Sequence, residues 1–190
     1  MSKKNWKNIK ETIFMVVSSL SFALMARTAI AEPRYIPSES MTPGLQIEDR
    51  LLIDKFTPWL GDPERGDIVV FTPPYLDIEP ENWQESFAQW HGYGKFTPLI
   101  KRVVGLPGET LEVKEGQVFI NGKIIQEKYL ENPPFYEFGP FTVPQDHVFV
   151  LGDNRNNSAD SHIWGPLPIK NIKGKSIFRF WPPSRIGITY

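Results

Sequence analysis

Two serines and a distant lysine have the residue types of a hydrolase active site. Ser38 and Ser40 stand in the segment PSESMTP at 37–43, where a proline at each end restricts the backbone. Residues two positions apart in an extended segment point to the same side, so we expect both hydroxyls to face one reactant. A serine hydroxyl is a weak nucleophile at neutral pH, and it needs a neighbouring base. A lysine is such a base only when its amine is kept deprotonated.

Lys101 lies in the apolar run 99–104, which predicts a β-strand. Alternation along a strand places Lys101 on one face and Arg102 on the other. Burial penalises the charged form of a lysine and lowers its pKa toward the range where it accepts a proton. Both faces of this run are otherwise apolar, so the pattern leaves open which of them meets the core. Ser40 and Lys101 are therefore the candidate nucleophile and base.

A third polar stretch, at 152–165, follows a predicted strand. Its short side chains favour local hydrogen bonds, and we expect turn architecture from Asp153, Asn154 and Asn156. Ser158 is a candidate to orient a neutral lysine, and Asp160 to hold the loop through a basic partner. The ligand spacing of a calcium loop is interrupted and its sixth-position glycine is missing, so we expect no metal.

Short β-forming runs and turn signals make up most of the remaining chain, and we expect a mainly β, antiparallel body. Glu115-Gly116 and Asn121-Gly122 between β-formers predict two consecutive hairpins. Residues 75–98 mix aromatic and polar side chains, and they predict an insertion or mobile loop that lies in a membrane interface or packs as a side cluster. The predicted strands are 67–71, 99–104, 110–113, 118–120, 123–125, 147–151 and 175–181.

The segment 12–31 is apolar apart from hydroxyls and Arg27, and it is long enough as a helix to cross a hydrocarbon core of about 30 Å. We expect a single transmembrane helix. The lysines before it predict a cytoplasmic tail at 1–11 and a catalytic body at 32–190 on the far side of the membrane. The small residues in 29–31 leave a cleavable secretory signal as the alternative.

Composition limits the partners. The 190 residues are 41% hydrophobic, which suits one domain with a core, and there is no cysteine for disulfide or thiolate chemistry. Five of the 21 basic residues but one of the 22 acidic residues precede residue 32, which leaves 16 basic against 21 acidic residues in the body. An acidic body argues against nucleic acid as a partner.

The chain resembles the bacterial type I signal peptidases, also called leader peptidases. Three motifs carry the resemblance behind the apolar segment: PSESMTPGL at 37–45, LIKRVVGLPGE at 99–109 and GDNRNNSADSHIWG at 152–165. The similarity spans nearly the whole chain. Its histidine at 162 is similar to that of cyanobacterial and plastid members.

The resemblance implies a Ser-Lys dyad in which Ser40 is the nucleophile and Lys101 the general base. It implies Ser38 as the side-chain oxyanion donor and Ser158 as the hydroxyl that positions the lysine. The other implied site residues are the supporting Asp160, Met41 and Arg102, and the substrate-binding Ile36, Met41 and Leu99.

Two residues depart from the family pattern. Gly44 takes the place of a commoner threonine, and His162 stands where many members have an arginine paired with the loop aspartate. A histidine is a cation only when it is protonated, so the partner of Asp160 stays open.

The implied function is that of a membrane-anchored serine endopeptidase that removes signal peptides from exported preproteins. It cuts after small residues, in an Ala-x-Ala pattern, through an acyl-enzyme and without a cofactor. Its expected partners are preproteins and a lipid bilayer, with no nucleic acid, and we expect a monomer. The membrane is the plasma membrane or the thylakoid membrane.

Three alternatives are open. A Ser-His-Asp hydrolase would use Ser40, His162 and Asp160, although two of these are too close in sequence to presume triad geometry. A soluble Ser-Lys self-cleaving regulator would share the dyad and the β body. A non-catalytic, membrane-anchored peptide-binding domain would require the loss of a dyad member, and none is missing.

Overall fold

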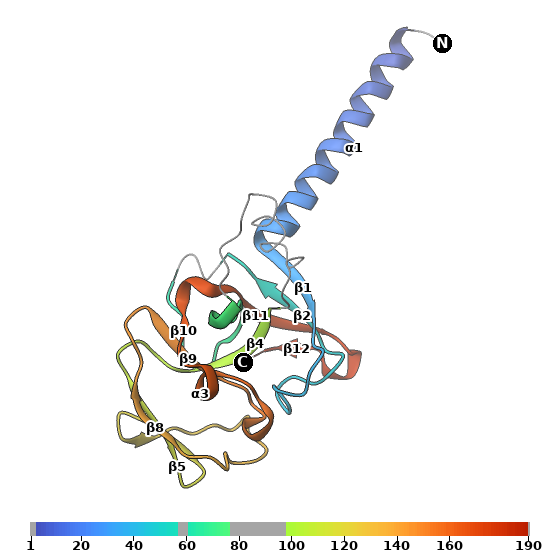
Figure 1. The fold of residues 1–190 in the computed structure, drawn as a ribbon. Helices are drawn as coiled ribbons and strands as arrows, with labels where there is room; N and C mark the ends of the chain where they lie inside the picture. The colour runs from blue at the N-terminus through green and yellow to red at the C-terminus, as the bar shows by residue number, and fades with distance from the viewer. Residues whose placement is uncertain (1–2, 57–60, 77–97, 190) are drawn as a thin grey trace.

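A long N-terminal helix projects from a β-rich body (Figure 1). The computed structural model describes residues 3–56, 61–76 and 98–189, with the backbone alone for 3–5, 7–8 and 23–30. The predicted insertion at 75–98 therefore lies almost entirely outside the described residues. Only its edges are described, in the 3-10 helix η2 (Pro74–Leu76) and at Pro98, directly before strand β4.

The larger sheet has eight strands in the order β1-β2-β11-β3-β4-β9-β10, with β12 paired to β11, and its pairings are antiparallel. Strand β4 is central in this order, next to β3 and β9. The strands are β1 (Ala31–Tyr35), β2 (Arg50–Asp54), β3 (Ile68–Phe71), β4 (Leu99–Gly105), β9 (His147–Leu151), β10 (Leu167–Pro168), β11 (Ile172–Trp181) and β12 (Gly187–Ile188).

The smaller sheet has the order β7-β6-β5-β8 and is antiparallel as well. Its hairpin turns place Glu115 and Asn121 at φ 50° and 51°, each followed by a glycine with positive φ. This is the left-handed conformation that two-residue hairpin turns require, so both predicted hairpins are confirmed. The strands are β5 (Thr110–Lys114), β6 (Gln117–Ile120), β7 (Lys123–Ile124) and β8 (Phe138–Thr142).

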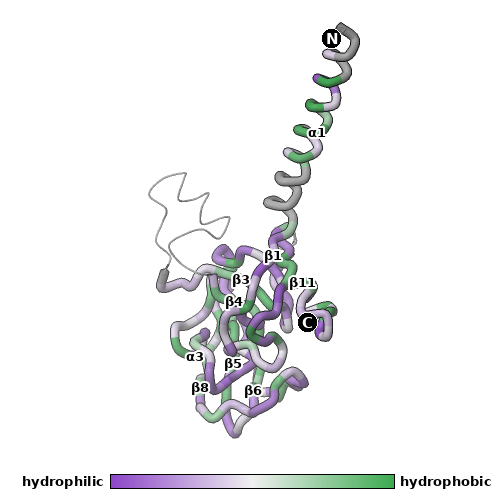
Figure 2. The backbone as a smooth tube through the Cα atoms, turned by 90° about the vertical axis from the view of Figure 1, so that its right-hand side faces the viewer, coloured by the Kyte–Doolittle hydropathy of each residue, from purple (hydrophilic) through white to green (hydrophobic). Residues whose placement is uncertain are grey.

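Three apolar clusters form the core, and β4 contributes to each of them. Val104 packs in the cluster of the smaller sheet, Ile100 against the cluster of β2 and β3, and Val103 in the cluster of β3 and β9. Both faces of β4 are thus covered, which explains why both faces of its sequence are apolar. Figure 2 shows hydrophobic stretches within the body and again on the projecting helix.

Helix α1 (Lys3–Ile30) confirms that the apolar N-terminal segment is helical. It begins at Lys3, so the predicted tail at 1–11 and the predicted membrane segment at 12–31 lie largely within one helix, and their division stays a prediction; Ala31 already belongs to β1. Arg27 lies among the residues whose side chains are not described. Within the part of the chain that is described, no helix has the length and apolar character needed to cross a membrane, and the transmembrane prediction is not confirmed.

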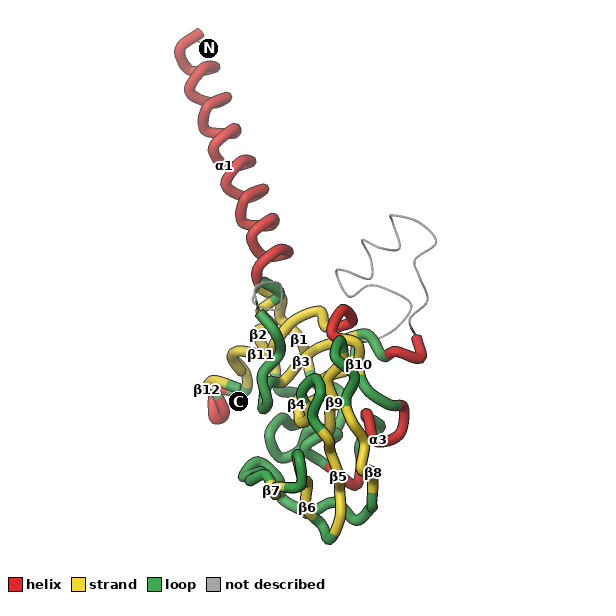
Figure 3. Tube along the Cα trace, turned by 90° about the vertical axis from the view of Figure 1, so that its left-hand side faces the viewer, coloured by secondary structure: helices red, strands yellow, loops and turns green. Residues whose placement is uncertain are grey.

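Short helices connect the strands, while the body remains mainly β (Figure 3). The strands β1, β2, β8, β10 and β12 were not predicted, because prolines, charges or very short length hide their alternation. The short helices are η3 (Arg155–Asn157), α3 (Ser161–Trp164), η4 (Ile169–Asn171) and η5 (Pro183–Arg185).

Candidate active site

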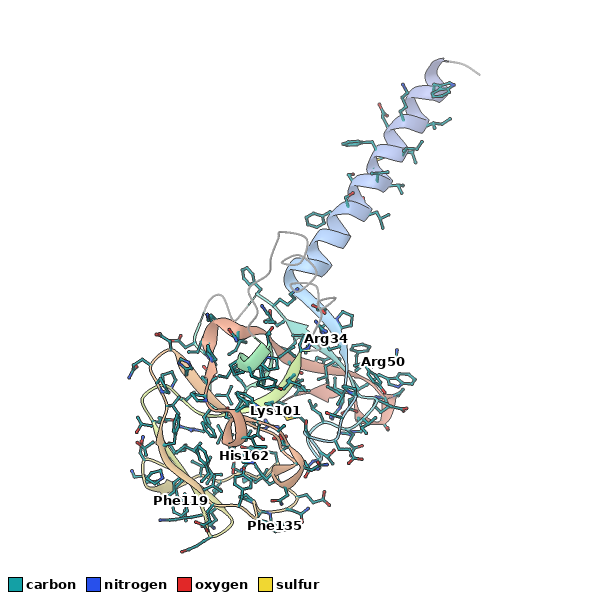
Figure 4. All side chains as sticks on the ribbon, viewed as in Figure 1. Arg34, Arg50, Lys101, Phe119, Phe135 and His162 are labelled. Carbon is teal, nitrogen blue, oxygen red and sulfur yellow. The ribbon has the colours of Figure 1, made fainter. Side chains whose placement is uncertain are left out.

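The hydroxyl of Ser40 lies against the amine of Lys101. Ser40 stands in the segment between β1 and β2, and Lys101 is the third residue of the central strand β4. Lys101 Nζ and Ser40 Oγ are hydrogen-bonded at 2.6 Å. Ser40 is partly exposed, whereas Lys101 is buried in the middle of the body (Figure 4). The pair joins a reachable hydroxyl to an amine shielded from solvent.

Buried side chains and backbone hydrogen bonds hold the segment that carries Ser40. Met41 and Leu45 are 0% and 1% exposed and pack with residues of β2 and β3. The Leu45 N–H donates to the Met41 carbonyl, and the Thr42 N–H donates to the Glu39 carbonyl. The backbone is fixed on both sides of Ser40, which gives its side chain a defined direction.

The Lys101 amine is buried, and burial favours its uncharged form. The residue is 3% exposed and lies opposite Val69 in the antiparallel pairing with β3. Burial lowers the pKa of Lys101 from 10.5 to about 8, while the carboxylates of Asp160 and Asp153 act in the opposite direction. At mildly alkaline pH a large fraction of this amine can therefore accept a proton.

Ser38 lies beside Ser40. The two Oγ atoms are 3.4 Å apart, and the Ser38 side chain is exposed. Two hydroxyls thus lie together, although the backbone at 38–40 is a bend and turn and not the extended segment that we expected. One of them contacts the amine, which leaves the other free to meet a reactant.

The loop that follows β9 binds the backbone of the serine segment. The Asn154 N–H donates to the Ser40 carbonyl at 3.1 Å, and the Asn154 side-chain amide donates to the Glu39 carbonyl at 3.3 Å. At Gly152 an added Cβ would overlap both the Ser158 side chain and the Ser40 carbonyl. A glycine is thus required where the loop and the serine segment approach each other.

Ser158 does not make the predicted hydrogen bond to Lys101. The residue is 9% exposed, and its Oγ has no hydrogen-bond partner among the described residues. The side chain packs beside Gly152, next to the Ser40 carbonyl. It is close to the dyad, but in this conformation it does not orient the amine.

The partner of Asp160, which the sequence left open, is His162. This carboxylate is 0% exposed; it accepts from the Gly152 N–H at 2.9 Å, and the Nδ1 atom of His162 lies 2.6 Å from its Oδ1. The His162 ring also stacks on Tyr136, with centroids 4.1 Å apart. Among the described residues, no hydrogen bond joins His162 to Ser40, so the geometry does not favour a Ser-His-Asp triad.

A family model described as signal peptidase, peptidase S26, matches residues 9–181. This chain belongs to the signal peptidase family S26. It is a serine endopeptidase that removes signal peptides from preproteins.

The relatives include cyanobacterial and chloroplast proteins, as the histidine at 162 suggested. "Probable signal peptidase I-2" of Synechocystis sp. is 45% identical over 98% of this chain and 78% of its own length. "Signal peptidase I" of Leptolyngbya laminosa is 47% identical over 94% of this chain and 83% of its own. "Thylakoidal processing peptidase 1, chloroplastic" of Arabidopsis thaliana is 43% identical over 90% of this chain and 48% of its own.

Behind the dyad of this signal peptidase, Arg102 forms a buried ion pair that we did not predict. Its guanidinium donates to both carboxylate oxygens of Asp153, at 2.8 and 2.7 Å, and it lies over the Tyr129 ring at 4.0 Å. We had expected Asp153 to be a turn residue; it lies in the bend after β9, and it also pairs with Arg102. Its carboxylate is buried against a guanidinium from the opposite face of the strand that carries Lys101.

The Arg102–Asp153 pair explains why residue 44 is a glycine. A Cβ built on Gly44 would overlap the Asp153 carboxylate and approach the Arg102 guanidinium. The commoner threonine would therefore displace the ion pair. The local sequence does not predict the contact of Gly44 with Asp153 and Arg102, because the three residues are far apart along the chain.

A second buried pair, Arg155 with Glu127, supports the same loop. The Arg155 guanidinium donates to Glu127 at 2.8 and 2.5 Å, and its Nε donates to the Gly152 carbonyl. Asn156 donates to the Pro133 carbonyl and accepts from the Phe135 N–H, so it joins two segments instead of closing a local turn. The sequence did not predict the Arg155–Glu127 ion pair, because a lone arginine in a polar loop is usually solvated.

Two of the three predicted substrate-binding residues are core residues. Ile36 and Met41 are 2% and 0% exposed in the cluster with β2 and β3, and Leu99 is half-buried against another cluster. Their contact with substrate stays a prediction. Within the described ranges, no three His, Asp or Glu side chains gather in a way that could hold a metal ion.

Proposed function

We propose that this signal peptidase cleaves preproteins with Ser40 as nucleophile and Lys101 as general base. The 2.6 Å contact between Ser40 Oγ and a buried Lys101 Nζ carries this proposal. The neutral amine takes the hydroxyl proton as Oγ attacks the scissile carbonyl, and the ammonium then protonates the departing amine. The same amine next takes a proton from water, whose attack releases the acyl group from Ser40.

The oxyanion is stabilised by the Ser40 N–H and the Ser38 hydroxyl. Support comes from the 3.4 Å spacing of the two hydroxyls and from the exposure of Ser38. Removal of one such donor typically costs about 3 kcal/mol of transition-state stabilisation. Met41 anchors the segment, Arg102 holds Asp153, and Asp160 holds the loop after β9 through the Gly152 N–H. Ser158, whose buried Oγ has no hydrogen-bond partner among the described residues, is the candidate hydroxyl for orienting the Lys101 amine.

The substrate is an exported preprotein cut after small residues at the first and third positions before the scissile bond. In this proposal Ile36, Met41 and Leu99 line the pocket for these small side chains; Leu99 is half-buried, whereas Ile36 and Met41 are 2% and 0% exposed. One added hydrophobic group changes recognition by about 1–3 kcal/mol in such pockets.

A leucine in place of alanine directly before the cut is expected to lower kcat/KM by about 10²-fold, because it overfills the pocket. Cleavage of preprotein variants, followed by mass analysis of the products, measures this. The matched control carries the leucine at the second position before the cut, where no small residue is required. Equal cleavage of both variants would reject the pocket.

Helix α1 anchors the chain, a monomer, in a bilayer with the catalytic body on the extracytoplasmic side. Support comes from large apolar side chains that are exposed along the helix, among them Phe14 at 73% and Phe22 at 74%. An uncovered apolar surface of this kind favours a lipid environment. The lysines that precede the apolar stretch favour a cytoplasmic N-terminus.

Phe14→Lys with Val17→Lys is expected to move the full chain from the membrane pellet to the supernatant in alkaline extraction. Each lysine costs about 3 kcal/mol at the centre of a membrane helix. A matched variant, Gln126→Lys with Glu131→Lys, places lysines on the exposed body and stays in the pellet. Release of the wild type under the same treatment would contradict the anchor.

A further inference from the structure

His162 is the titratable partner of a buried carboxylate next to the dyad. It is the second residue of α3, a short helix whose N-cap is Asp160. Its Nδ1 lies 2.6 Å from the Asp160 Oδ1, and its side chain is 17% exposed against 0% for Asp160. Solvent protons thus reach the imidazole more readily than the carboxylate that it touches.

The charge of Asp160 acts on Lys101. Burial lowers the pKa of Lys101, and the Asp160 carboxylate is the strongest influence in the opposite direction. A group that neutralises Asp160 therefore favours the uncharged amine, which is the form that can remove the Ser40 proton. His162 is such a group whenever its ring is protonated.

We propose that His162 is a positioning residue whose protonation tunes the general base: an imidazolium on Asp160 offsets the field that this carboxylate exerts on Lys101. The proposal rests on the proposed roles of Ser40 and Lys101. It assigns a task to the residue that stands where many family members have a permanent cation.

The sign of the effect follows from the charges. With neutral His162, the Asp160 charge is uncompensated and favours the Lys101 ammonium. When His162 carries a proton, its charge offsets that of Asp160 and favours the uncharged Lys101 amine. Lowering the pH then reduces the uncharged fraction of Lys101 less than it would if residue 162 stayed neutral.

The other groups around His162 do not replace it in this role. Burial raises the pKa of Tyr136, whose phenol stays neutral under the stacked ring. Beyond Tyr136, Arg155 and Glu127 offset each other as an ion pair. Strand β9 packs on α3, and its titratable residue, His147, stands at the end of the strand away from Gly152.

Asp153 is the other carboxylate that acts on Lys101, and it is already held by Arg102 at 2.7 Å. A guanidinium keeps its charge throughout the working pH range. The influence of Asp153 is therefore constant with pH. Asp160 differs because its partner is an imidazole, which can be neutral or charged.

Two variants of the full-length enzyme separate the charge of residue 162 from its structural role. His162→Gln keeps a hydrogen-bond donor for Asp160 without a charge, and His162→Arg supplies a permanent cation. The measurement is kcat/KM from pH 5.5 to 9.5 with a peptide that has no ionisable group near the cut. Each profile is normalised at pH 9.5, which removes any pH-independent loss caused by altered packing.

After normalisation, wild type and His162→Gln are expected to agree near pH 8 and to diverge as pH falls, with wild type about three- to tenfold more active at pH 5.5. His162→Arg is expected to exceed wild type by the same factor near pH 7 and to meet it at pH 5.5. Tyr136→Phe keeps the stacked ring and is expected to give the wild-type profile. A ratio of wild type to His162→Gln that is constant with pH, or an arginine profile like that of glutamine, would overturn the proposal.

Lys101→Ala, assayed in parallel, separates this proposal from the one on which it rests. Activity that survives in Lys101→Ala refutes the dyad, and with it the reason for tuning. A required Lys101 together with pH-independent ratios refutes the role of His162 alone. Thermal unfolding of each variant verifies that the compared proteins are folded.

Discussion

Lys101→Ala is expected to lower kcat for preprotein cleavage by at least about 10⁴-fold, with KM changed little, because the general base is lost while the binding surface remains. Lys101→Arg is expected to be equally inactive, since a guanidinium cannot be deprotonated at working pH. Single-turnover cleavage by the purified full-length variants measures both. Lys114→Ala, on the smaller sheet, is the matched control and keeps wild-type activity.

The pH dependence of the wild type provides an independent check. The pKa of Lys101 is lowered to about 8, and the reactive form is the deprotonated one. Activity should therefore rise with pH below about 8 and level off above it, with the acid side broadened by His162. A profile that falls as pH rises from 6 to 8 would contradict a lysine base, as would substantial cleavage by Lys101→Ala.

The paired hydroxyls are expected to respond differently to substitution. Ser40→Ala removes the nucleophile and is expected to leave only background cleavage. Ser38→Ala removes one oxyanion donor and is expected to lower kcat by about 10²–10³-fold, with KM nearly unchanged. The difference arises because Ser40 Oγ contacts the amine at 2.6 Å, whereas Ser38 Oγ lies 3.4 Å from the Ser40 Oγ.

Acyl-enzyme trapping with a slowly released ester separates the two roles. Ser38→Ala should still form the adduct on Ser40, slowly, whereas Ser40→Ala should form none. Ser184→Ala, an exposed serine remote in sequence from all three motifs, is the control for hydroxyl removal. An adduct on Ser38 in the wild type would reverse the assignment.

Local signals were sufficient for much of the body and for part of the site. The hairpins at Glu115-Gly116 and Asn121-Gly122 depend on a few neighbouring residues, and strand alternation separated Lys101 from Arg102 in the right way. The strands β1 and β2 lack such a signal, since Pro33 and alternating charges obscure the first of them. Pairing across the sheet, which the chain completes only when folded, defines these strands.

The residues that the sequence did not indicate act through long-range charge pairing. The residues near Asp153 in the sequence do not predict its pairing with Arg102 of β4. The residues near Gly44 do not predict that the Asp153 carboxylate leaves no room for a side chain there. The partner of Asp160 was ambiguous because histidine changes charge with pH. Such contacts depend on tertiary packing, which periodicity and turn chemistry do not report.

The hydrogen bonds that join the loop after β9 to the serine segment also link parts of the chain that are synthesised at different times. Asn154 binds the backbone of Glu39 and Ser40 across more than a hundred residues, and Lys101 meets Ser40 across 61. A growing chain on the ribosome therefore contains Ser40 and Lys101 before it contains the loop that binds the serine segment. The full set of contacts around Ser40 can form only after Asn154 has been synthesised.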